Sequence, residues 1–100
     1  MSYPIGQPTI DVYSNVPAYD VGVEVVAPIS IIWSRLEIHA MNLTDVLRVA
    51  FAPGEIAAGR YVTVSYTVPL IIDGPGAVNT VYLFSGTSVT TADARVVAFR

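Results

Sequence analysis

The chain has 100 residues, of which 53% are hydrophobic and only 13% are charged, and its formal net charge is −3. It contains no lysine, no cysteine and a single histidine, His39. These values predict one domain, residues 1–100, and exclude disulfides, thiol catalysis and thiolate metal sites. They also argue against nucleic acid as a partner, because neutralising phosphates requires clustered basic residues.

The sequence indicates neither secretion nor membrane binding. The N-terminus, Met1-Ser2-Tyr3-Pro4, lacks the basic and apolar regions of a signal peptide, so we expect an unprocessed intracellular product. The strongly apolar stretches 25–33 and 68–72 are too short to cross a bilayer. No basic amphipathic segment suits an anionic membrane surface, so we expect no membrane partner.

Residues 1–20 combine prolines with tyrosines. Proline favours an extended backbone, and tyrosine offers a rigid ring with a polar tip. Two interpretations fit the segment: an extended arm that packs on a neighbouring subunit, or an edge strand with a frayed tip. The first interpretation makes five residues candidates for an interface: Tyr3, Pro4, Ile5, Tyr13 and Tyr19.

The rest of the chain is rich in β-branched and aromatic residues, and turn signals recur at roughly the 8–12-residue spacing of a sandwich or barrel. The expected strands are 9–13, 21–27, 29–41, 46–51, 60–72, 78–85 and 94–99. We predict an all-β fold, an antiparallel β-sandwich or β-tulip/barrel-like domain of about seven strands with an extended N-terminal arm. Residues 55–58 are expected to add a single helical turn.

Period-two alternation assigns faces to the two longest expected strands. In 29–41 the small and apolar residues oppose the charged and aromatic ones: Ile32, Ser34, Leu36, Ile38 and Ala40 against Trp33, Arg35, Glu37 and His39. In 60–72 the alternation directs Val62, Val64, Tyr66 and Val68 inward. Pro69 has no N–H to donate, so we expect an edge or a bend at that end of the strand.

The row of Arg35, Glu37 and His39 is the first candidate for chemistry. A carboxylate beside an imidazole can form a general base and its orienting partner. An ion-paired, solvated strand face is the alternative that we favour. The acidic residues lack the D-x-D spacing of calcium loops and suit turns. We therefore expect a non-enzymatic protein with no catalytic residue, cofactor or metal site.

Trp33, the single tryptophan, allows two functions. With Tyr61 facing outward on another strand, it could form a stacking platform for sugar, which would make the protein a carbohydrate-binding or adhesin-like module. The alternative, which we favour, is a residue of an interface or of the core. Trp33 and Tyr61 therefore join the candidate interface residues.

The hydrophobic excess points to assembly. A domain of this size buries only about 60–70% of its unfolded surface, and large exposed apolar patches normally mark a partner. Monomeric β proteins commonly guard their sheet edges with lysine, which this chain lacks. We expect a dimer or trimer that also binds another protein surface.

Three tracts carry a resemblance to a known class. LRVAFAPGEIAAGRY at 47–61, together with TVYLF at 80–84 and ARVVAF at 94–99, resembles the small β-rich virion proteins of tailed phages. The resemblance implies a capsid decoration or cement protein with a sandwich or tulip-like body and a terminal arm. Such proteins sit on the capsid exterior as dimers or trimers, so the implied partner is a major capsid protein. No residue is carried over as a binding residue.

Overall fold

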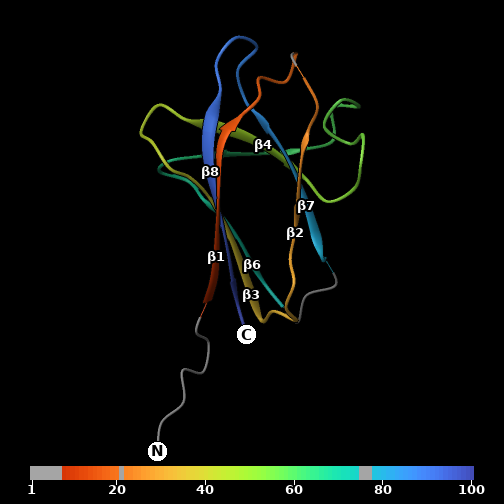
Figure 1. Ribbon diagram of the computed structural model, residues 1–100, viewed down its shortest axis with the longest axis vertical. Coiled ribbons are helices and arrows are strands. Elements are labelled where there is room, and N and C mark those ends of the chain that lie inside the picture. Colours follow the sequence, from red (N-terminus) through yellow and green to blue (C-terminus); the bar gives the residue numbers. More distant parts are fainter. Residues whose placement is uncertain (1–7, 21, 75–77) are drawn as a thin grey trace, which may run out of the picture.

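The structure, a computed structural model, describes residues 8–20, 22–74 and 78–100 (Figure 1). Two antiparallel sheets of four strands each form a β-sandwich, as the sequence predicts. Sheet A has the order β1-β8-β3-β6 and sheet B the order β2-β7-β4-β5. The strands are β1 (Pro8–Val16), β2 (Val25–Pro28), β3 (Arg35–Ala40), β4 (Val46–Ala50), β5 (Val62–Ser65), β6 (Leu70–Asp73), β7 (Thr80–Ser85) and β8 (Ala92–Phe99).

The structure has eight strands rather than the expected seven, because the 60–72 segment divides. Ser65 and Val68 exchange two backbone hydrogen bonds of 3.2 Å each, which close a tight turn between β5 and β6. The two strands then join different sheets, each at an edge. The bend expected at Pro69 is therefore confirmed. The inward faces assigned to Tyr66 and Val68 are wrong, because both side chains lie in the exposed turn.

The expected strand 29–41 is shorter in the structure and begins only at Arg35. Leu36, Ile38 and Ala40 are buried, as the alternation predicts. Upstream of Arg35 the alternation is wrong, because no strand imposes it there. Trp33 is 3% exposed and Ile32 is 87% exposed, the reverse of the expected faces.

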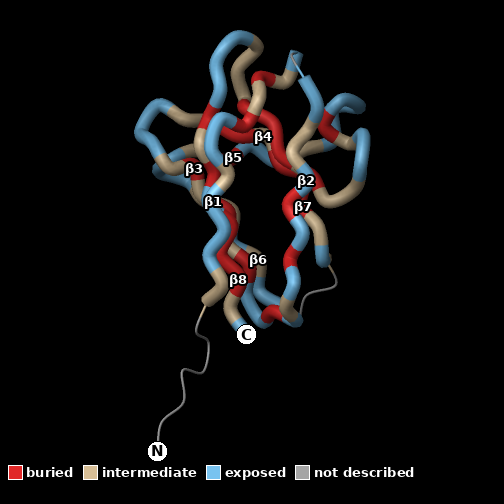
Figure 2. Tube along the Cα trace, viewed as in Figure 1, coloured by how far each residue is buried: buried red, intermediate tan, exposed pale blue. Residues whose placement is uncertain are grey.

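The main core lies between the two sheets, where the inner faces of all the central strands are buried (Figure 2). A second, smaller cluster of Ala50, Ile56 and Phe84 lies on the outer face of sheet B. The connection 51–60 covers it by folding back over that face. This connection contains one hydrogen bond of helical spacing, from the N–H of Ala58 to the carbonyl of Gly54 (3.1 Å), and no helix.

The connection 86–91 and residues 17–20 and 22–24 lie at one end of the sandwich, the connection 41–45 projects from its side in the same half, and the C-terminus lies at the other end (Figure 1). Within residues 8–16 the first segment of the chain is the edge strand β1, which matches the second of the two interpretations of that segment. In the described part of the chain, no helix is long and apolar enough to cross a membrane.

Candidate functional site

Four of the seven candidate interface residues lie in the described part of the chain, and these four do not form one surface. Tyr3, Pro4 and Ile5 lie outside the described residues. Tyr13 is half-buried on β1 and packs against the main core. Trp33 is inside that core, where its indole N–H donates to the carbonyl of Val78 at 2.7 Å. Trp33 is therefore a core residue, one of the two roles favoured above, and neither an exposed interface residue nor a sugar platform. The hydrogen bond explains the burial, because it satisfies the one polar atom of the ring.

Tyr19 and Tyr61 are engaged within the molecule. Their rings enclose the guanidinium of Arg48, whose central carbon lies 3.7 Å from the Tyr19 centroid and 4.5 Å from the Tyr61 centroid. Such cation–π stacking is worth about 0.5–2 kcal/mol for each ring, depending on desolvation. Arg48 projects from the outer face of sheet B, so the stack holds two connections against that sheet.

The charged row of β3 lies on the outer face of sheet A. Glu37 pairs with both neighbours, at 3.0 Å from its Oε2 to Arg35 Nε and at 2.8 Å from its Oε1 to His39 Nε2. Both carboxylate oxygens are thus occupied. The row is ion-paired, as favoured above, but both contacts run along β3, and the side chains of Glu37 and His39 are only 17% and 22% exposed, so this part of the face is not solvated.

Beside this row lies a polar hollow of about 360 Å³ that sequence reasoning missed. Its charged and hydroxyl groups come from His39, from its cross-strand neighbour Arg95, and from Tyr66 in the β5–β6 turn. Only the pairing of β3 with β8 and the division of the 60–72 segment bring these three residues together. No sequence signal joins them.

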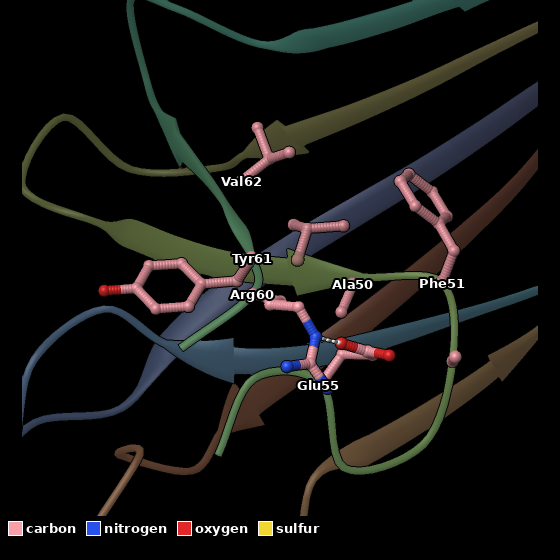
Figure 3. A pocket seen from close by; sticks show the side chains of 8 residues that line it. Ala50, Phe51, Glu55, Arg60, Tyr61 and Val62 are labelled. Carbon is pink, nitrogen blue, oxygen red and sulfur yellow. Dashed lines mark hydrogen bonds and ion pairs between the residues drawn. The ribbon is translucent and has the colours of Figure 1, made fainter. Parts of the chain in front are cut away.

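An apolar hollow of about 430 Å³ lies beside β4 (Figure 3). Phe51, Val62 and Tyr61 contribute to its walls, and the small Ala50 and Ala52 leave it open. An ion pair between Arg60 and Glu55 lies within the lining. The hollow was not predicted, because it depends on how the connection 51–60 folds back.

Large apolar side chains project into solvent over much of the described surface, including Val26 on β2, Ile71 on β6, and Ile32 and Val68 in connections. Ile10 and Val12 on the edge strand β1 are 57% and 53% exposed and share the outer face of sheet A. Val23, Leu43 and Val89, each at least 75% exposed, lie in three connections in the half of the sandwich away from the C-terminus. An isolated domain gains nothing from such placements, since each side chain leaves apolar area in water.

Hydrogen bonds hold the base of those connections in place. The carboxylate of Asp93 accepts from the backbone N–H of Asn15 (2.9 Å) and from the side-chain amide of Asn42 (3.1 Å). The same amide donates to Asp45 Oδ2 at 2.7 Å. The acidic residues here act as turn and loop ties, as expected for Asp45 and Asp93.

The described residues therefore define an antiparallel β-sandwich with a long edge strand and exposed aliphatic loop tips. No protein-family model, curated protein or solved structure matches the chain.

Proposed function

We propose that the protein is a non-enzymatic structural protein that self-associates and binds a repetitive protein surface. The observation that carries the proposal is the exposure of large aliphatic side chains on the β1 edge and at the loop tips. Burying one such side chain contributes about 1.5–3 kcal/mol, so a few of them together can support association.

In its most specific form, the proposal is a decoration or cement protein on the capsid exterior of a tailed phage, with a major capsid protein as the partner. The sandwich body supports it, since the resemblance of the tracts at 47–61, 80–84 and 94–99 implies such a body. The loop tips Val23, Leu43 and Val89 are the surface that we assign to the shell. Their connections lie in the half of the molecule away from the C-terminus, with 41–45 at its side, so a partner surface that contacts all three must wrap around that half (Figure 1).

The placement of the aromatic rings does not favour the carbohydrate-binding alternative. A sugar platform needs an exposed aromatic face. Trp33 is buried, and the Tyr61 ring stacks on Arg48.

Self-association is tested by light scattering coupled to size exclusion, over a dilution series and in high salt. We expect a dimer or trimer at micromolar concentration that persists in 1 M NaCl, because burial of apolar area is not screened by salt (about 3 Å Debye length at 1 M). A monodisperse monomer under all conditions would contradict the proposal.

Shell binding is tested by co-sedimentation with tailed-phage capsids that lack their decoration protein. We expect Leu43→Ser combined with Val89→Ser to weaken co-sedimentation at least tenfold. Ile32→Ser is the matched control, because Ile32 is equally exposed but lies in the segment whose neighbours Trp33 and Ser34 bond to Val78 and Phe99, away from the loop tips. Equal loss in both variants would rule out the loop tips as the binding surface.

A further inference from the structure

We infer that β1 pairs antiparallel with β1 of a second copy across a two-fold axis, which joins the four-stranded sheets A of two molecules into one. The inference rests on the proposed self-association and names its interface. Four observations carry it: the direction of the β1 backbone groups, the protection of the other edges, the exposed side chains of β1, and the registers that symmetry allows.

The backbone groups of Ile10 and Val12 point away from the sheet. The N–H of Met41 donates to the carbonyl of Asp93 at 3.0 Å, which continues the β3–β8 ladder by one pair. Backbone groups alternate sides along a strand, so Val96 directs its own groups to β1. Its partner on β1 is Asp11, which directs its own groups back to β8. Ile10 and Val12, on either side of Asp11, therefore offer their N–H and C=O groups to a further strand.

The other three sheet edges are poorer sites for pairing. The edge strands β2, β5 and β6 have four residues each, against nine in β1. β2 ends in Pro28, which has no N–H. β6 ends in the charged Asp73, and the β5 edge closes on itself through the hydrogen bonds between Ser65 and Val68. Short length, proline and charge are the common protections of edge strands. Thr9–Tyr13 carries none of these except Asp11, whereas β1 begins with Pro8 and has a bulge between Tyr13 and Val16, so its central residues are the part open to pairing.

The exposed side chains of β1 add apolar burial to the backbone bonds. Ile10 and Val12 lie on the outer face of sheet A, and Ile10 is next to Val97 in the β1–β8 register. A two-fold axis at Val12 sets the two Val12 side chains opposite each other, with the Ile10 of each copy on the same face two residues along its strand, opposite Ser14. The result is one apolar stripe across the junction of the two sheets.

A second copy is the occupant because two-fold antiparallel pairing is self-complementary: each strand supplies the donors and acceptors that the other needs. Symmetry allows axes at Ile10, Asp11 or Val12. An axis at Asp11 sets two carboxylates opposite each other. An axis at Ile10 sets Pro8, which has no N–H, opposite Val12. The axis at Val12 avoids the first, moves Pro8 to the outer end of the pairing opposite Val16, and sets Asp11 opposite Tyr13, whose hydroxyl can donate to the carboxylate.

The first experiment uses the absence of cysteine from the chain. Single variants Ile10→Cys, Asp11→Cys and Val12→Cys are oxidised, and covalent dimers are measured on non-reducing gels. With the axis at Val12, the Cα atoms of residue 12 in the two copies lie about 5.5 Å apart, within disulfide range. The two copies of residue 10, and the two copies of residue 11, are displaced from each other along the strands and lie more than about 7 Å apart. We expect Val12→Cys to cross-link at least tenfold faster than either. Val89→Cys, on an exposed loop, gives the rate for random collision.

The second experiment compares two proline variants. Val12→Pro removes an N–H that points outward, a position that an edge strand tolerates, so the monomer fold remains. Asp11→Pro removes an N–H that bonds to β8, so we expect this variant to lose the fold. That loss would confirm that the backbone groups of Asp11 point inward and those of Val12 outward. We expect Val12→Pro to keep the wild-type circular dichroism spectrum and to lose the dimer in light scattering.

The outcomes separate this inference from the proposed function. A wild-type oligomer that survives Val12→Pro, with Val12→Cys no faster than Val89→Cys, overturns the β1 interface and leaves self-association standing. A monomeric wild type overturns both. If Val12→Pro does not fold, the cysteine rates decide alone.

Discussion

Two single residues show how the environment, rather than the local pattern, decides what a side chain does. Trp33 and Ile32 are neighbours, yet the first is buried and the second is exposed. Alternation assigns them the opposite way, because it assumes a strand that the structure does not have at these positions. The indole is accepted into the core because a carbonyl receives its N–H, and burial of a polar atom then costs little.

Trp33→Phe tests that account. The variant removes the hydrogen bond to Val78, leaves the carbonyl without its donor and reduces the packed volume, so we expect a loss of about 1–3 kcal/mol in the free energy of unfolding. Urea denaturation followed by circular dichroism measures it. Tyr66→Phe, at an exposed position, is expected to stay within about 0.5 kcal/mol. Equal effects of the two changes would mean that the indole bond does not stabilise the core.

Tyr13 gives the fold a dependence on alkaline pH. Burial, and secondarily the Asp11 carboxylate, raise the pKa of Tyr13 above its ordinary value of 10.0. The folded state therefore holds this proton more tightly than the unfolded chain. The stabilisation is complete below the unfolded pKa and is lost as the pH rises through the folded one.

We expect the free energy of unfolding to fall more steeply above pH 10 in the wild type than in Tyr13→Phe. Urea denaturation at several pH values on either side of Tyr13's ordinary pKa of 10.0 provides the measurement. The comparison isolates residue 13, because the two proteins are identical at every other position. Parallel pH profiles would remove Tyr13 as the cause.

At the scale of elements, the sequence predicts strands where alternation and turn signals agree. The expected strands 46–51, 78–85 and 94–99 match β4, β7 and β8 to within two residues at each end. The prediction fails at 60–72, where the residue types of all thirteen positions suit a single strand. The turn at Tyr66 and Thr67 gives no signal, because it contains no glycine, proline or asparagine. The two hollows were also beyond prediction, since both depend on which elements pack side by side. Two features of the candidate site follow from composition: an unprotected sheet edge from the absence of lysine, and exposed aliphatic side chains from the 53% hydrophobic content.

Gly86 fixes how closely the end of β7 approaches β4. Its N–H donates to the Val46 carbonyl at 2.7 Å, and an added Cβ would lie 2.6 Å from Val46 Cγ1. We expect Gly86→Ala to destabilise the protein by about 1–3 kcal/mol through overpacking. In a double-mutant cycle with Val46→Ala, which removes the obstructing methyl, the combined loss should be smaller than the sum by at least about 0.5 kcal/mol. Additive losses would place the strain elsewhere.

At the scale of the whole molecule, sheet A depends on residues from both ends of the chain. β8 lies between β1 and β3, and its Phe99 faces Pro8 across the first of these pairings. Composition predicts strands but not this order, because the order arises from which edges remain free as the sheets form. Pairings between distant residues also slow folding, since loop-closure entropy must be overcome first.

We therefore expect refolding over about milliseconds to seconds, the range of β-sandwiches of this kind. Stopped-flow fluorescence of Trp33 can follow it, because the indole passes from water into the core. A rate that does not change with protein concentration identifies the step as intramolecular. Complete refolding well below a millisecond would show that local structure, not strand pairing across the chain, limits the rate.

The pairing of β1 with β8, the first and last strands of the chain, gives the sandwich two different ends. Pro8 and Phe99 are paired, the C-terminus lies at one end, and the connections that carry Val23, Leu43 and Val89 lie in the opposite half. A peptide or protein appended after Arg100 would leave from the end farthest from those tips. If the tips hold the protein on a shell, the appended cargo is displayed outward, one copy per subunit, without competing for the attachment surface. The same geometry makes the chain a candidate scaffold for regular surface display.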